Sequence, residues 1–286
     1  MEENKGSWLV PVAIIICLLL IGGAVYFKDV KPQDSNNDAS STGNLVASPV
    51  LDQILTLDDG RGGIFDVKQF DLSALRPVDA SDHILGSASA PVKIIVYTDL
   101  ECPACKYYHT QLKTLESKYV TTGKLAIIYR AFPLDQIHSK VRNEFMAAEC
   151  VNELGGNDKY WQFVAKIFEI TPSNNGLDPA KLGETAKALG INVKSFDTCV
   201  AAGKYADKIQ KSQDEATAVG APGTPTTFVI DPQGGISPRG FAYQSSALSA
   251  AVDLLLTMPA ATAPAAIAPV ATTTGVVAGT STVVSE

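Results

Sequence analysis

Two cysteines at the spacing Cys-x-x-Cys are the residues whose types and spacing most directly suggest chemistry. Cys102 and Cys105 enclose Pro103 and Ala104. Such a pair serves either as a redox-active dithiol or as half of a zinc site, in which His109 could be a third ligand. Structural zinc sites usually add a second close pair of ligands, and the chain has no second cysteine pair at this spacing. We therefore favour a redox dithiol and expect no metal.

The flanking residues place Cys102 at the start of a helix. Residues 91–98 form a β-branched run typical of a buried strand. Pro103 suits the first helical position because its missing N–H has no partner there, and apolar residues continue at helical spacing until Gly123. A helix N-terminus favours the thiolate over the thiol. The sequence therefore predicts that Cys102 attacks and that Cys105, one turn further in, resolves.

The patterns that follow predict an α/β domain. A second strand at 125–130 is expected to run parallel to the first, because the helix between them acts as a crossover. Helical segments are predicted at about 139–153, 158–170, 178–189, 195–202 and 204–219. A strand at 226–230, a weak strand at 236–241 and a helix at 246–256 follow. This order is typical of helices packed on a mixed sheet.

Short motifs occur in a fixed order between about Ser81 and Leu256. They are Asp82-His-Ile-Leu-Gly86, Ala90-Pro91-Val92, Asp99, Cys102-Pro-Ala-Cys105, Arg130-Ala-Phe-Pro133 and Gly223-Thr-Pro-Thr226. In this order they resemble the DsbA-like thioredoxin-fold oxidoreductases, in the branch with a membrane-anchored amino terminus. The resemblance implies a thioredoxin-like fold with an all-helical insertion at about 135–219. It also implies a cis Thr224–Pro225 bond beside the dithiol, whose backbone edge would pair with an extended substrate.

Two positions depart from the family pattern. Many relatives carry a carboxylate six residues before the first active cysteine, where it exchanges a proton with the buried thiol; here that residue is Val96. Water or another group must then serve, and Asp99 is one candidate, although it could also cap the strand end. The best-known oxidase of the family has a histidine where this chain has Ala104. Its absence should raise the pKa of the Cys102 thiol and make a weaker oxidant.

The function that the resemblance implies is oxidation of cysteines in exported proteins. The alternatives are a disulfide isomerase or reductase of the same fold, and a non-redox peptide-binding module. The expected partners are exported proteins that contain cysteine and a membrane-bound redox partner, either a quinone-linked reoxidant or a reductant. No cofactor is expected.

Two further cysteines, Cys150 and Cys199, lie in the predicted insertion, with Cys150 expected to end a helix. Four cysteines allow three pairings, and the pattern alone does not choose among them. Relatives of this branch often carry cysteines at the matching places. The resemblance therefore implies a structural disulfide between Cys150 and Cys199, if Cys102 and Cys105 cycle with each other. Two buried free thiols are the alternative.

Two histidines are predicted to have no part in the chemistry. His109 follows Cys105 on the predicted helix and is expected at the surface. His138 stands at the start of the predicted insertion and is expected to be a helix-entry residue.

An apolar segment at 8–27 predicts a membrane-spanning helix. It holds 20 uncharged residues, 17 of them apolar, and a helix of this length matches a hydrocarbon core of roughly 30 Å. A cleaved signal peptide is the alternative, because residues 22–24 are small, although the apolar core of a signal peptide is usually only about 7–15 residues long. Cys17 would lie inert within the membrane. Residues 1–7 are predicted to be a cytoplasmic N-terminus.

The remaining domain boundaries follow from composition. They are a flexible linker at 28–49, a pre-domain segment of unknown role at 50–80, the DsbA-like domain at 81–257 and a disordered tail rich in Ala, Thr, Pro and Val at 258–286. The net charge of −7, without a block of Lys or Arg, argues against a nucleic-acid partner. A cycling dithiol belongs where thiols are not kept reduced. We therefore expect a single-pass protein of the cell membrane, with its catalytic domain in the periplasm or at the cell exterior.

Overall fold

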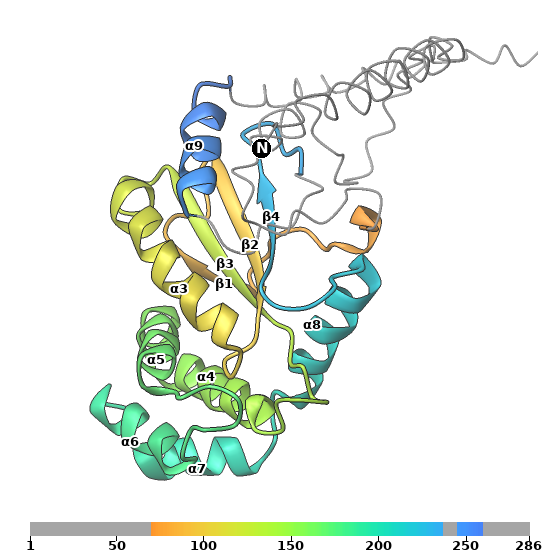
Figure 1. Cartoon of the computed structure of the whole chain (residues 1–286). Helices are drawn as coiled ribbons and strands as arrows, with labels where there is room; N and C mark the ends of the chain where they lie inside the picture. Colours follow the sequence, from red (N-terminus) through yellow and green to blue (C-terminus); the bar gives the residue numbers. More distant parts are fainter. Residues whose placement is uncertain (1–69, 237–244, 260–286) are drawn as a thin grey trace, which may run out of the picture. The chain divides into compact units, whose positions relative to one another are not determined.

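A four-stranded mixed sheet forms the centre of the domain (Figure 1). The computed structural model describes residues 70–236 and 245–259. The strands are β1 (His83–Leu85), β2 (Val92–Thr98), β3 (Leu125–Ala131) and β4 (Thr226–Ile230), in the order β1-β3-β2-β4. β2 and β3 run parallel, and the short strands β1 and β4 pair antiparallel with them at the two edges. The predicted α/β class with a mixed sheet is confirmed.

Seven α-helices are described around this sheet. They are α3 (Pro103–Leu115), α4 (Val141–Gly155), α5 (Asn157–Ile170), α6 (Ala180–Ala188), α7 (Val193–Ala201), α8 (Ala206–Val219) and α9 (Ser245–Leu255). A single π-helical turn (Glu116–Val120) continues α3, and a 3₁₀ turn (Leu72–Ala74) comes before the sheet. The ends of α4 to α9 lie within two residues of the predicted ends. Of the weak strand predicted at 236–241, only Ile236 lies among the described residues, where it forms a bridge with Ile230; residues 237–241 are not described.

Alternate residues of the central strands enter two separate cores, because successive side chains of a strand point to opposite faces. Val92, Ile94 and Val96 of β2 belong to the core that α3, α9 and the helices α4 and α5 cover. Ile95 and Tyr97 belong to the other core, which α8 and residues 70–78 cover. Thus α8, within the predicted insertion, packs on the sheet itself, whereas α4 to α7 gather at the end of the sheet where α3 begins (Figure 1).

A disulfide joins Cys150 on α4 to Cys199 on α7, with an S–S distance of 2.02 Å and a Cα–Cα distance of 5.9 Å. Cys150 does not end its helix, as the sequence had suggested, because α4 continues to Gly155. The two helices of the insertion are therefore linked covalently as well as by packing.

Several predicted segments fall outside the described residues. No helix of the described part of the chain is long and apolar enough to cross a membrane. The predicted span at 8–27, the linker at 28–49, residues 50–69 and residues 260–286 are not described. Residues 70–80, which the sequence assigned to a segment before the domain, pack against it: Leu75 is buried, and the ring of Phe70 lies 5.3 Å from that of Phe228.

Candidate functional site

Cys102 and Cys105 lie at the N-terminus of α3, as the sequence predicted. Cys102 is the residue that caps the helix, and Pro103 occupies the first helical position. Both cysteines are free thiols, and only 7% of Cys102 and 2% of Cys105 is exposed. The first sulfur therefore borders the surface at the helix end, and the second lies beneath it in the core.

The two thiols differ strongly in acidity. A hydrogen bond from the Cys105 thiol, contacts with Thr224 and the backbone N–H groups of Cys105 and Ala104 outweigh burial, and together they lower the pKa of Cys102 to about 6. Complete burial and the adjacent Cys102 sulfur raise the pKa of Cys105 well above its ordinary value. At neutral pH the first sulfur is a thiolate and the second keeps its proton. This asymmetry is what attack by Cys102 and resolution by Cys105 require.

The loop before β4 lies against Cys102. The Thr224–Pro225 peptide bond is cis, and the Thr224 carbonyl oxygen lies 3.5 Å from the Cys102 sulfur. The Thr226 hydroxyl donates to the carbonyl of Gly223 and closes the turn at 2.7 Å. The motif residues that the sequence singled out in two distant segments therefore meet at one place.

Asp99 lies directly beneath the dithiol. Its backbone N–H donates to the Cys105 sulfur at 3.4 Å, and its carbonyl accepts from the N–H of Cys102 at 3.2 Å. Its fully buried carboxylate accepts from the N–H groups of Leu134 and Glu101, at 2.9 and 2.8 Å. Val96, where relatives carry a carboxylate, is an apolar residue of the core around the two cysteines. Asp99 is therefore more than a cap on the strand end.

His138 stands just before α4, as expected for a helix-entry residue, and its carbonyl accepts from the N–H of Val141. Its side chain is only 3% exposed, and its Nδ1 atom lies 2.9 Å from Asp99 Oδ2. Burial lowers the pKa of His138, but Asp99, the side chain of Asn174 and the negative sulfur of Cys102 raise it by more, so that it lies above its ordinary value. The sequence analysis did not predict this contact, because 39 residues separate the histidine from Asp99.

The expectation for His109 was wrong, because His109 is 8% exposed and not a surface residue. Its Nδ1 atom lies 2.9 Å from the hydroxyl of Tyr129, and its ring stacks on that of Phe168. Burial lowers the pKa of His109 to about 4, so the ring is neutral at physiological pH. Among the described residues, no group of three or more His, Cys, Asp or Glu side chains is placed to hold a metal ion.

Two buried glutamates near the dithiol were missed entirely. Glu101 is fully buried, and its Oε2 atom accepts from the N–H of Asn175 at 2.6 Å. Glu144 on α4 is 2% exposed, and burial together with the neighbouring Glu101 raises the pKa of Glu144 to about 9. A sequence signal did exist, because Glu144 lies between Val141 and Phe145 on the apolar face of α4.

The comparison with known families decides the identity of the fold. The family model described as thioredoxin matches residues 79–238, more than half of the chain. The chain belongs to the thioredoxin family. The predicted resemblance to DsbA-like proteins is confirmed at the level of the fold, and the membrane-anchored branch rests on residues that the structure does not describe.

Solved structures of DsbA-type proteins share the fold of this thioredoxin-family chain. Oxidised BdbD from Bacillus subtilis superposes with a TM-score of 0.53 at 19% identity, over 66% of this chain and 97% of BdbD. Wolbachia pipientis α-DsbA1 gives a TM-score of 0.53 at 24% identity, over 63% of this chain and 94% of that protein. The predicted thioredoxin-like fold with a helical insertion is confirmed at this level.

Curated relatives fall into two groups. Disulfide bond formation protein D of Bacillus subtilis is 25% identical over 162 residues, which cover 54% of this chain and 71% of that protein. The Na(+)/H(+) antiporter NhaA 3 of Salinispora tropica is 30% identical over 177 residues, which cover 62% of this chain but 25% of the antiporter. The chain thus matches about a quarter of the length of that relative.

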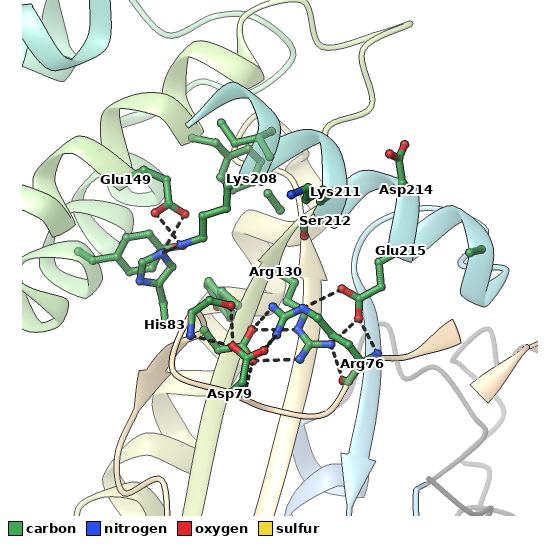
Figure 2. Close-up of a pocket in the computed structure, with 18 of the residues that line it drawn as sticks. Arg76, Asp79, His83, Arg130, Glu149, Lys208, Lys211, Ser212, Asp214 and Glu215 are labelled. Atoms are coloured by element: carbon green, nitrogen blue, oxygen red, sulfur yellow. Dashed lines mark hydrogen bonds and ion pairs between the residues drawn. The ribbon is translucent and has the colours of Figure 1, made fainter. Parts of the chain in front are cut away.

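A second charged region of this thioredoxin-family domain lies around a cavity of about 720 Å³ (Figure 2). Arg130 on β3 is 2% exposed and bonds Asp82 at 3.0 Å and Glu215 on α8 at 2.6 Å. Nearby, Glu149 on α4 accepts from Lys208 at 2.7 Å and contacts His83 at 2.9 Å. Neither cysteine of the dithiol lines this cavity. These ion pairs connect the segment before β1, the sheet, α4 and α8.

Proposed function

We propose that this chain is a thiol-disulfide oxidoreductase that acts outside the cytoplasm and oxidises cysteine pairs of exported proteins. The observation that carries the proposal is the acidity of Cys102, with a pKa of about 6, set against the protonated and buried Cys105. The thioredoxin family and the DsbA-type fold support it.

The reaction cycle follows from the positions of the two sulfurs. In the oxidised form, a substrate thiolate attacks the Cys102 sulfur, a mixed disulfide forms, and Cys105 leaves and takes up a proton. The second thiolate of the same substrate then attacks the substrate sulfur of the mixed disulfide. This attack releases Cys102 as a thiolate. The substrate loses two electrons to form its disulfide, and the enzyme dithiol gains them. A low pKa makes Cys102 a good leaving group, which favours substrate oxidation.

The cis-proline loop provides a place for the substrate backbone. Thr224 and Pro225 lie beside Cys102, and the turn leads into β4 at the edge of the sheet. We assign to this loop the pairing of an extended peptide, whose cysteine would then face the Cys102 sulfur. Pro103 and Ala104, between the cysteines, shape the helix end and supply the N–H of Ala104 to the thiolate.

Location and reoxidation complete the proposal. The apolar segment at 8–27 would anchor the chain in the membrane, and the polar residues 28–49 would tether the domain at its outer side. A membrane-bound redox partner would then remove the two electrons. The name of the Bacillus relative, disulfide bond formation protein D, agrees with this direction of electron flow.

A trapping experiment on the full chain tests function and location together. Cys105→Ser should accumulate mixed disulfides through Cys102, because the resolving thiol is gone, and the captured proteins should carry export signals. Cys102→Ser is the matched control and should capture nothing. Capture by Cys102→Ser would reverse the assignment, and capture of cytoplasmic proteins would contradict the location. Equilibration of the dithiol with glutathione separates an oxidase from a reductase or isomerase by its potential.

A further inference from the structure

The Cys-Pro-Ala-Cys motif has no charged side chain between its cysteines, yet a buried histidine from another segment lies beside it. We propose that His138, held by Asp99 beneath the dithiol, supplies the fixed positive charge that stabilises the Cys102 thiolate and so sets the potential of the enzyme. Asp99 and Asn174 are positioning residues in this proposal, because they act through His138. The inference rests on the proposed oxidoreductase function and deepens it.

Asp99 connects the histidine to both cysteines. Its backbone N–H contacts the Cys105 sulfur at 3.4 Å, and its carbonyl accepts from the backbone N–H of Cys102 at 3.2 Å. Its carboxylate meets His138 Nδ1 at 2.9 Å. Asp99 therefore contacts both the imidazole and the dithiol, and both His138 and Asp99 are buried. A charge at such a site is less screened than one at the surface.

Burial raises the pKa of Asp99, whereas its hydrogen bonds oppose this rise and fix the direction of the carboxylate. The N–H of Leu134 and the N–H of Glu101 donate to the carboxylate, at 2.9 and 2.8 Å. Such backbone N–H donors stabilise the ionised form of a carboxylate, and they do not titrate themselves. With these donors in place, Oδ2 is directed at the imidazole of His138.

The loop at residues 173–175 is strained and is bonded to Glu101, two positions after Asp99. Ser173, Asn174 and Asn175 have positive φ angles of 66°, 52° and 65°, which are uncommon for residues other than glycine. The loop is held in place because the N–H of Asn174 donates to the carbonyl of Glu101 at 2.9 Å and the N–H of Asn175 to its carboxylate. The side chain of Asn174 is among the groups that raise the pKa of His138. Strain of this kind persists where the surroundings enforce it, often at functional sites.

Asp99 is the acceptor at Nδ1, and the imidazole becomes a cation when the second ring nitrogen also carries a proton. The charged groups that act on the imidazole are Asp99, which follows β2, and Cys102, which caps α3. Asp99 also acts on Glu144 of α4, whose other charged neighbours are Glu101, before α3, and Lys140, at the start of α4. Asp99 and the Cys102 thiolate are the anions that favour the imidazolium. Glu144 keeps its proton at neutral pH, because its pKa is about 9. By stabilising the reduced form, the imidazolium makes the disulfide a stronger oxidant.

The first test compares two buried histidines in the reduced full chain. His138→Gln removes the imidazolium and should raise the pKa of Cys102 by about one unit, from about 6, so that its alkylation at pH 6 slows about fivefold. The exchange equilibrium with glutathione should shift toward the disulfide by about tenfold, equivalent to about 30 mV. His109→Gln is the matched control, because His109 is neutral, and it should change neither quantity.

Asp99→Asn tests the positioning role. If Asp99 acts through His138, adding His138→Gln to this variant should change the thiolate pKa much less than it does in the wild type. An equal effect of His138→Gln in both backgrounds would remove Asp99 from the proposal.

A second test needs no substitution, because coupling between two sites is reciprocal. Nuclear magnetic resonance of the wild type should show a higher pKa for His138 in the dithiol form than in the disulfide form. Equal values in both forms, or an unchanged Cys102 pKa in His138→Gln, would overturn the inference. If instead the wild-type thiol of Cys102 titrated near 8.5, like an ordinary cysteine, the proposed function itself would fail.

Discussion

Two buried glutamates on α4, five positions apart, have opposite electrostatic environments. Glu149 is 7% exposed; burial raises its pKa, but hydrogen bonds and charges from His83 and Lys208 lower it below the ordinary value. Glu144 is 2% exposed, and burial and Glu101 raise its pKa to about 9. Its Oε2 atom is buried without a hydrogen-bond partner in the described part of the chain. One helix therefore carries an ionised and a protonated glutamate at similar depth.

The difference extends to the two regions that these residues belong to. Around the cavity in Figure 2, Arg130 and Arg76 meet Asp82 and Glu215, and the pKa of Asp82 is lowered by these arginines against the opposing effect of burial. Beside the dithiol, burial raises the pKa of Asp99 despite its hydrogen bonds. Paired charges are typical of a structural network, whereas shifted protonation in an enclosed site is typical of a functional one.

The largest expected effect comes from breaking the paired region. Arg130→Met should lower the free energy of unfolding by about 5 kcal/mol, at the upper end of the range for removing one partner of a buried pair, because Asp82 and Glu215 each lose one of their two arginine partners. The ion pairs of Arg130 with Asp82 and Glu215 are short, and its side chain is 1% exposed. Urea unfolding at pH 7 measures the loss.

Lys166→Gln is the control for this experiment. Lys166 pairs with Glu169 at 2.6 Å, but the two side chains are 45% and 65% exposed. Water screens such a pair, so the free energy of unfolding should change by less than about 0.5 kcal/mol. A similar loss in Arg130→Met and Lys166→Gln would mean that burial does not distinguish the paired region.

The covalent link on the same helix should have the next largest effect. Cys150 and Cys199 close a loop of 49 residues, and loss of the bridge in Cys150→Ala/Cys199→Ala should cost about 4 kcal/mol on the chain-entropy model. Urea unfolding of both proteins with the Cys102 and Cys105 dithiol reduced measures the cost. Peptide mapping of the non-reduced wild type should find the 150/199 link. Free, alkylatable thiols at both positions would contradict the pairing.

The sequence predicted the parts of the site that are local along the chain. Cys102 was placed at a helix N-terminus because Pro103 and the preceding β-branched strand lie within a few residues of it. The helices of the insertion were predicted from their periodicity and from terminal residues such as Gly190. β1 was not predicted, because three residues are too few to show a strand pattern.

The sequence could not predict contacts between distant segments. His138 reaches Asp99 across 39 positions, and Asn175 reaches Glu101 across 74. A histidine before a helix has the same local pattern whether it is exposed or enclosed. Its role depends on the helical block folding back onto the start of α3, which no short-range pattern encodes.

The two glutamates of α4 allow the smallest and sharpest prediction, because the same substitution should have opposite effects at the two positions. Below the ordinary pKa of 4.5, Glu144 is protonated in both the folded and the unfolded chain. As the pH rises toward about 9, the unfolded chain loses this proton and the folded one keeps it, so stability falls by about 1.4 kcal/mol per pH unit. Glu144→Gln removes this cost and should stabilise the protein by up to about 3 kcal/mol at pH 7.

Glu149→Gln should do the reverse. The lowered pKa of Glu149 gives stability that is present above its ordinary value of 4.5 and is lost as the pH falls through the folded-state pKa. A neutral amide loses the charged hydrogen bonds to Lys208 and His83, which should cost about 2 kcal/mol at pH 7 and less in acid. Urea unfolding of the wild type and both variants between pH 4 and pH 9 measures the two profiles. If both substitutions changed the free energy of unfolding at pH 7 in the same direction, Glu144 and Glu149 would not have opposite electrostatic environments.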